Sequence, residues 1–205
     1  MDATKITPLG VMVLALLREG DMHPYEMMRL MRHRRDDRIF RIQNGTFYHT
    51  ISSLERAGLL TEIGVDRDGN RPERTTYSLS ESGAAAVVDW VRRELTRLDR
   101  PTEFRVALAE AHNLERAEVL DLLTRRRELL AAHHDELASG LADAATRSVP
   151  GQFLVEASRE SALLDADLRW HDALLAQLAD HSLAWGLDEV PADPYLHTLR
   201  QDQEQ

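Results

Sequence analysis

The segment 43–60, QNGTFYHTISSLERAGLL, constrains the fold most, because it joins an amphipathic helix to the start of a β-strand. Phe47, Ile51, Leu54 and Gly58 recur at spacings of four, three and four residues, which gives the helix one apolar face. At about 100° per residue, the opposite face is polar and consists of His49, Ser52, Ser53 and Arg56, with Thr46 and Tyr48 on its flanks. A short polar face of this kind fits a groove of DNA.

The start of this helix also carries candidate caps. Asn44 and Thr46 each have a side-chain oxygen that could accept a hydrogen bond from the first amide groups of the helix. We therefore expect the helix to begin near these two residues.

A β-hairpin is predicted directly after the helix. Residues 60–64 and 74–79 are candidate strands, and Asp68, Gly69 and Asn70 between them are turn-forming residues. The same region supplies three basic side chains: Arg67, Arg71 and Arg74. Such side chains can bind a DNA backbone or enter a minor groove, so we assign all three to a DNA-binding surface.

Two further helices are predicted before this segment. Thr7 and Pro8 form a helix start and Gly20 a helix end, and the second helix begins near Pro24. Three short helices followed by a hairpin predict a winged helix-turn-helix. Ser80 is expected to cap a fourth helix, which closes a DNA-binding domain at residues 1–99.

The rest of the chain is predicted to be long, acidic and helical over residues 100–190, with a polar tail at 191–205. Leucines recur at alternating spacings of three and four in two places, and the interface residues assigned to them are Leu120, Leu123, Leu130, Leu164, Leu168, Leu175 and Leu178. Two such seams either pack within one chain or join two chains. Because Leu163 and Leu174 would remain uncovered in a monomer, we favour a homodimer. The expected fold is mainly α with a small β-hairpin wing, followed by a helical dimerisation domain.

The charge distribution separates the two parts. The net charge is −10, but residues 1–99 hold 15 basic and 15 acidic residues, so residues 100–205 carry the whole excess. Within the neutral part, residues 29–41 contain six arginines and only two aspartates. This run is either a solvated helix end or a phosphate-binding surface, and its position before the candidate DNA-reading helix favours the second.

Other classes of protein are disfavoured. The chain has no cysteine, no apolar run long enough for a membrane span and no secretory signal pattern, so a cytoplasmic protein without membrane contact is expected. Asp167 and His171 lie one helical turn apart, but two ligands alone do not make a metal site. No catalytic motif is present, so we expect neither an enzyme nor a cofactor.

Several motifs together resemble the PadR family of bacterial transcriptional regulators: TPLGVMVLALL, HPYEMM, NGTFYHTISSLERAGLL and RTTYSLSESG. The stretches EFRVALAEAHNLERAEVLDLLTRRRELL and EASRESALLDADLRWHDALL resemble the two-helix dimerisation module of its longer subgroup. The resemblance implies a homodimer that binds a palindromic operator of double-stranded DNA, represses its own and neighbouring promoters, and is released by an aromatic small molecule.

At matching positions the resemblance implies DNA contacts from Tyr25, Asn44, Gly45, Thr46, Tyr48 and Arg74. The chain departs from the family at Pro24, where a glycine is common, and at His49, where a proline is common. Because His49 lies on the predicted outer face, its imidazole is a candidate base contact that relatives do not have.

Some assignments have a structural alternative. Trp90 and Trp170 are candidate stacking partners for an aromatic effector, although tryptophans at helical spacing more often lie in a core or an interface. Tyr25 and Tyr48 could contact DNA or pack at the edge of the core, and Tyr77 is expected in the core. The whole domain could also be a winged-helix module that binds an acidic protein and no DNA.

Overall fold

The computed structural model describes residues 6–66 and 74–186. Its helices and strands run in the following order: α1 (Pro8–Arg18), α2 (Pro24–His33), the 3-10 turn η2 (Asp36–Arg38), α3 (Asn44–Arg56), β1 (Leu60–Asp66), β2 (Arg74–Leu79), α4 (Glu81–Leu95), α5 (Pro101–Ala109), η3 (Ala111–Asn113), α6 (Arg116–Thr146), η4 (Gly151–Phe153) and α7 (Val155–Ala179). The predicted fold class, mainly α with a two-stranded hairpin, is confirmed.

Local sequence sets the starts of three helices. The Thr7 side chain caps α1 and accepts a hydrogen bond from the Gly10 amide at 3.1 Å. His23 caps α2 through a bond from the Tyr25 amide at 3.1 Å, while Glu26 accepts from the His23 amide at 2.6 Å. The Ser80 hydroxyl accepts from Gly83 at the start of α4, as predicted. Each cap satisfies an amide that the helix itself leaves without a partner.

The hairpin lies directly after α3. Strands β1 and β2 pair antiparallel, with Leu60 opposite Leu79 and Asp66 opposite Arg74, and an irregularity interrupts the register between Glu62 and Gly64. Residues 67–73, which join the strands, lie outside the described part of the chain, and so do the side chains of residues 65, 66 and 74.

The N-terminal core forms around α1, where residues 9–17 are all buried. The inner face of α3 packs into this core through Phe47, Ile51 and Leu54, and α4 adds Val87 and Trp90. The apolar spacing that predicted α3 therefore corresponds to its buried face.

Helix α5 extends this core beyond residue 100. Phe104, Val106 and Ala107 are buried and belong to the same cluster of apolar side chains as α1 and α4. The predicted domain boundary at 99/100 remains a prediction, and the buried core is continuous across it.

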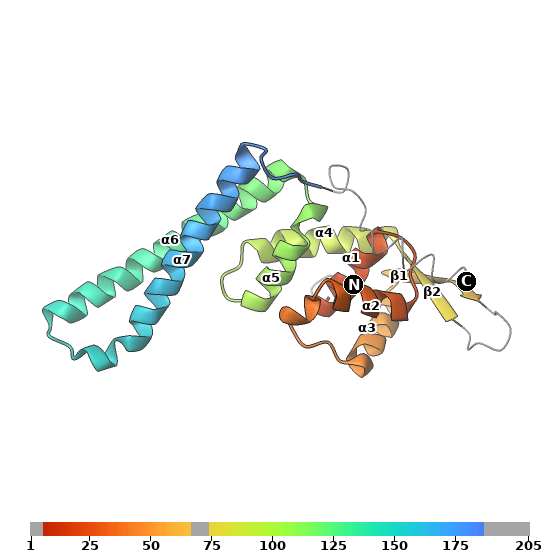
Figure 1. Cartoon of the computed structure of the whole chain (residues 1–205), viewed down its shortest axis with the longest axis horizontal. Coiled ribbons are helices and arrows are strands. Elements are labelled where there is room, and N and C mark those ends of the chain that lie inside the picture. The colour runs from red at the N-terminus through yellow and green to blue at the C-terminus, as the bar shows by residue number, and fades with distance from the viewer. Residues whose placement is uncertain (1–5, 67–73, 187–205) are drawn as a thin grey trace.

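Helices α6 and α7 form a long antiparallel hairpin that projects away from the winged-helix part (Figure 1). Their facing sides pack on each other within the same chain: Leu123, Leu130 and Leu178 are only 0%, 4% and 1% exposed. Arg127 and Asp172 add an ion pair across the two helices, with Nε and Oδ1 2.8 Å apart. These three leucines are therefore covered inside one chain, whereas the other four leucines of the seams are half-buried: Leu120, Leu164, Leu168 and Leu175.

A compact group of side chains joins α5 to the α6–α7 hairpin. The Arg126 guanidinium of α6 lies 3.5 Å from the centre of the Phe104 ring, and the His171 ring of α7 stacks on the same phenylalanine at 6.0 Å. Arg126 also donates to the backbone carbonyl of Arg97. Both Arg126 and His171 are buried, so these contacts connect the hairpin to the winged-helix part.

Candidate nucleic-acid interface

Helix α3 has one buried and one exposed face. Its inner side chains are those of the core, whereas the polar residues chosen from the sequence all face solvent: Thr46, Tyr48, His49, Ser52, Ser53 and Arg56. Tyr48 is 46% exposed and meets the buried Phe47 ring edge-on, at 5.9 Å between ring centres. It therefore packs against the core edge and remains accessible from outside.

The start of α3 differs from the prediction. Gln43 is the N-cap, no side chain caps the helix, and Asn44 is already the first helical residue. The Asn44 Oδ1 instead accepts a hydrogen bond from the Arg32 guanidinium at 3.3 Å. Asn44 is drawn toward α2 because a charged donor lies within its reach, and it does not turn back onto its own helix.

The first amides of α3 are consequently open to the outside. Asn44, Gly45 and Thr46 are exposed, and a Cβ added at Gly45 would meet nothing within 4 Å. Amides at a helix start carry partial positive charge and bind phosphate. This end of α3 therefore combines backbone donors with the polar face that follows it.

Two side chains on the outer face are partly engaged by the helix itself. The Thr50 hydroxyl donates to the Thr46 carbonyl at 2.8 Å, and Arg56 Nε donates to the Ser52 carbonyl at 3.1 Å. His49, Ser52 and Ser53 remain exposed in the middle of the face. These three side chains can present donors and acceptors to base edges.

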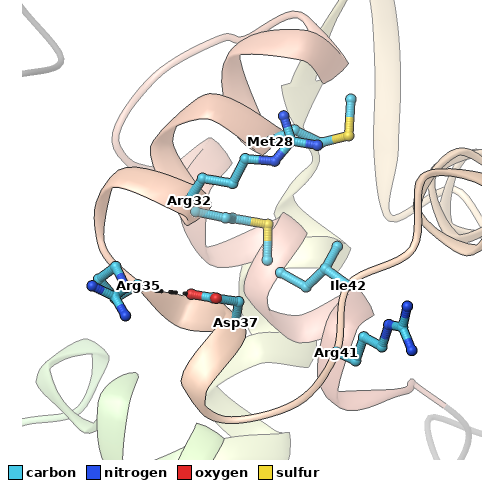
Figure 2. Close-up of a pocket in the computed structure, with 7 residues that line it drawn as sticks. Met28, Arg32, Arg35, Asp37, Arg41 and Ile42 are labelled. Carbon is cyan, nitrogen blue, oxygen red and sulfur yellow. Dashed lines mark ion pairs between the residues drawn. The ribbon is translucent and has the colours of Figure 1, made fainter.

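The arginine run before α3 divides into two groups. Arg34 is engaged within the protein, because its guanidinium donates two hydrogen bonds to the Glu19 carboxylate, at 2.6 and 2.7 Å. Arg32, Arg35 and Arg41 are exposed and line a cavity of about 440 Å³ between α2 and the segment before α3 (Figure 2). Only part of the predicted basic run is therefore available to a ligand.

Arg105 of α5 holds the segment that leads into α3. Its two terminal nitrogens donate to the carbonyls of Arg38 at 2.8 Å and Ile39 at 3.3 Å. Sequence reasoning did not identify Arg105, because its partners are backbone atoms more than sixty residues away. No local pattern indicates such a contact.

A group of acidic residues lies beneath the same segment. Burial raises the pKa of Asp36, and burial together with the carboxylates of Asp36 and Glu19 raises the pKa of Glu110 to about 7. The Asn113 side chain donates to Glu110 Oε2 at 3.2 Å and opposes this rise. Glu110 therefore changes its charge near neutral pH, close to η2.

The remaining DNA-binding candidates lie at the start of α2 and in the β-hairpin region. Tyr25 is 54% exposed at the start of α2, so its hydroxyl is accessible. Arg67 and Arg71 lie outside the described residues, and for Arg74 only the backbone, at the start of β2, is described. Tyr77 packs against the core, as expected.

The two tryptophans assigned to an effector have different surroundings. Trp90 is 2% exposed and donates through Nε1 to the Ile6 carbonyl at 3.1 Å, so its ring is part of the core. Trp170 on α7 is 41% exposed and meets the His171 ring edge-on at 4.8 Å. Of the two side chains, only Trp170 presents a ring to solvent.

The described residues contain neither a metal-binding cluster nor a membrane-spanning helix. Across residues 6–66 and 74–186, no group of three or more His, Asp or Glu side chains could hold a metal ion. In the same part of the chain, no helix has the length and apolar character required to cross a membrane.

Comparison with known proteins finds a family-model match in the N-terminal part. Residues 13–89 match the model of the Transcriptional regulator PadR-like family, whereas no curated protein matches the chain. The chain is similar to Bacillus subtilis PadR in complex with operator DNA, with 21% identity, coverage of 83% of this chain and 98% of that chain, and a TM-score of 0.39. The structure of smu.1604c from Streptococcus mutans UA159 is 18% identical, covers 82% and 98%, and has a TM-score of 0.39.

The complex of Bacillus subtilis PadR with p-coumaric acid is 18% identical, covers 84% of this chain and 99% of that chain, and has a TM-score of 0.37. The family-model match runs from within α1 to within α4 and includes the strands β1 and β2. Over residues 13–89, the chain is similar to the PadR-like family of transcriptional regulators.

Proposed function

We propose that the protein is a dimeric, sequence-specific DNA-binding regulator that inserts α3 into the major groove. The observation that carries the proposal is the exposed polar face of α3, with His49, Ser52 and Ser53 at its centre and uncapped amides at its start. The opposite face is fixed in the core by Phe47 and Ile51, so the helix presents its polar side rigidly. Rigid presentation of donors and acceptors is what base readout requires.

Charge supports the same assignment. The acidic excess lies in residues 100–205, whereas exposed arginines surround the start of α3. Arg32 and Arg41 would lie near the phosphates that flank a helix in the groove, and the hairpin arginines Arg67, Arg71 and Arg74 would bind the backbone on the other side. Tyr25 and Arg56 would add contacts at the edges.

The second copy would be held by the α6–α7 hairpin. Its outer surface exposes large apolar side chains at Leu129, Leu163 and Trp170, and the last two lie seven residues apart and thus on one face of α7. Exposed apolar side chains on a protruding element indicate a protein interface. Of the seven leucines assigned to the interface, Leu120, Leu164, Leu168 and Leu175 are the ones with partial exposure.

The dimer has its own test, which is sedimentation of the purified full-length chain. We expect a dimer that Leu163→Asp combined with Trp170→Asp converts to a monomer. Ile63→Asp, which changes an exposed apolar residue of β1, should leave the dimer intact. A monomeric wild-type chain, or a double variant that still dimerises, would contradict this interface.

Repression and its release complete the proposal. A dimer bound at a palindromic operator would block transcription of its own promoter and of neighbouring genes. An aromatic small molecule would then release the DNA. Trp170, which is 41% exposed in the single chain, would stack on this molecule at the interface between the two copies.

Fluorescence anisotropy with the DNA upstream of the gene tests the proposed function. We expect tight binding to that DNA, weaker binding to a scrambled duplex of equal composition, and a steep loss of affinity between 50 and 200 mM salt, by about 10³-fold or more if six or more phosphates are contacted. Equal affinity for both duplexes, or no salt dependence, would contradict DNA reading. Binding of an acidic protein in the absence of any DNA binding would instead support the protein-interaction module.

A further inference from the structure

Asn44 is followed by Gly45, and this pair forms the start of α3. In an Asn-Gly pair the backbone nitrogen of the glycine can attack the side-chain amide carbon of the asparagine, because glycine has no Cβ that hinders the approach. Both residues are exposed, and a Cβ added at Gly45 would meet nothing within 4 Å. Water therefore reaches the two groups that would react.

The attacking nitrogen is not engaged by the helix. The α-helical hydrogen bonds of α3 begin with the Phe47 amide, which donates to the Gln43 carbonyl at 2.9 Å, so the Gly45 amide precedes them. No side chain caps this end of α3. The first turn can therefore open at low cost, which ring closure between Gly45 and Asn44 requires.

A positive charge lies beside the carbon that would be attacked. The Arg32 guanidinium of α2 donates to Asn44 Oδ1 at 3.3 Å. Negative charge develops on this oxygen during the attack, and a cationic donor bonded to it stabilises the tetrahedral intermediate. The partial positive charge at the start of α3 acts in the same direction.

We propose that Asn44 is a deamidation site, at which the Gly45 nitrogen displaces the side-chain amide and Arg32 stabilises the oxyanion of that step. The bond between Gly45 N and Asn44 Cγ forms, and the bond between Cγ and Nδ2 breaks. The Gly45 amide proton passes to the leaving nitrogen, so ammonia departs and a succinimide remains. Water then adds to one of the two ring carbonyls and gives aspartate or isoaspartate.

The modification would weaken DNA binding, a consequence that rests on the proposed function. Either product carries a carboxylate where Asn44 has a neutral amide, and this charge repels a phosphate at the start of α3. Isoaspartate also inserts a carbon atom into the main chain, which displaces the amides of Gly45 and Thr46. The protein would therefore lose affinity for DNA as it ages.

Peptide mass spectrometry of the full-length chain, incubated at mildly alkaline pH over days to weeks, measures the modification directly. Chromatography separates the aspartate and isoaspartate peptides. Asn113 is the internal control, because Leu114 follows it and its Nδ2 donates to the Glu110 carbonyl at 2.9 Å. We expect Asn44 to lose its amide roughly tenfold faster than Asn113, or more, because the Leu114 side chain hinders the attack. Equal rates at the two asparagines would overturn the inference.

Variants at the neighbouring residues test their roles. Gly45→Ala should slow the loss of the Asn44 amide roughly tenfold, because the added Cβ hinders the nitrogen while the fold has room for it. Arg32→Gln should slow it roughly threefold or more. Arg41→Gln, which removes another exposed arginine and leaves the bond from Arg32 intact, should not change the rate.

Urea provides the matched control for Arg32. Once the fold is lost, Arg32→Gln and the wild-type chain should react at equal rates, because Arg32 no longer lies beside Asn44. If folded Arg32→Gln reacts as fast as the wild type, or faster, the hydrogen bond only restrains Asn44 and the inference is wrong.

Fluorescence anisotropy of fresh and aged protein separates this inference from the proposed function. The aged wild-type chain should bind its upstream DNA more weakly, in proportion to the modified fraction. The affinity of Asn44→Gln, whatever its initial value, should not change with age, because the longer side chain does not close the five-membered ring. Equal affinity of fresh and modified wild-type protein would contradict the effect on DNA binding.

The two measurements fail independently. If the chain binds no DNA while Asn44 still loses its amide, the proposed function fails and the deamidation site stands. If the chain binds DNA and Asn44 keeps its amide, the site is wrong and the proposed function stands.

Discussion

Arg105 on α5 donates a hydrogen bond of 2.8 Å to the backbone carbonyl of Arg38, which lies in the turn before α3. A second bond from the same guanidinium reaches the next carbonyl, so one side chain holds two consecutive peptide groups. Because α5 also contacts α6 and α7 through Phe104, the position of α3 is connected to the hairpin by a short chain of contacts.

Replacing Arg105 should weaken DNA binding without changing its salt dependence. Arg105→Gln loses two bonds that fix the entry to α3, so we expect an affinity loss of roughly threefold to tenfold. The slope of log Kd against log salt should stay the same, because Arg105 is bonded to backbone and not to phosphate.

Arg105→Lys is the matched variant, because it keeps the charge and loses the planar pair of donors. It should bind DNA as weakly as Arg105→Gln. Full affinity in the lysine variant would show that charge, and not the position of the turn, is what Arg105 contributes.

Gly83 should be far less tolerant of alanine than Gly140, although both lie inside helices. A Cβ at Gly83 would overlap the Leu59 carbonyl and lie 2.8 Å from Leu79 Cδ1, whereas a Cβ at Gly140 meets nothing within 4 Å. We expect Gly83→Ala to lower the free energy of unfolding by about 2–4 kcal/mol. Gly140→Ala should raise it by about 0.5–1 kcal/mol. Urea denaturation of the two variants measures both changes in the free energy of unfolding. Equal changes would contradict the close packing of α4 on the β1–β2 hairpin.

Stability should fall as the pH rises through the titration of Glu110. Its folded pKa of about 7 lies above the ordinary value of 4.5, so the folded chain binds this proton more tightly than the unfolded chain. The resulting stabilisation is complete below about pH 4.5 and lost above about pH 7, and it amounts to at most about 3 kcal/mol.

Glu110→Gln should remove this pH dependence, because it stays neutral at every pH. Relative to wild type, the variant should be more stable at pH 8 and similar at pH 5, as measured by urea denaturation at both values. The exposed Glu128→Gln should leave the pH dependence unchanged. If Glu110→Gln retains the wild-type slope, Glu110 is not the titrating group.

Local patterns predicted the elements that local interactions determine. The Thr7–Pro8 start, the Ser80 cap and the apolar spacing of α3 depend on residues within four positions of one another, and all three are confirmed. The prediction that Asn44 caps α3 is wrong, because its partner, Arg32, is twelve residues away on another helix. A cap prediction weighs only neighbours in sequence and does not include a competing donor.

The α6–α7 hairpin also shows that local sequence spacing does not identify contacts between distant parts of the chain. Leucine spacing identified both long helices and the faces that pack, but the same pattern fits one chain or two. The structure covers Leu123 and Leu178 within the chain, whereas Leu163 on the outer surface is exposed. Likewise, no spacing rule indicated that Phe104, Arg126 and His171 would meet, because three separate helices contribute them.

The base preference of the wild-type chain and of His49→Ala tests the central claim, that the outer face of α3 reads DNA. Both proteins would be selected against a randomised duplex library and the enriched sequences compared. His49 is exposed in the middle of that face, so its removal should abolish preference at one base position in each half-site, at a cost of about 1–3 kcal/mol, and leave other positions unchanged. An unchanged sequence profile in His49→Ala would contradict this account of how the protein reads DNA.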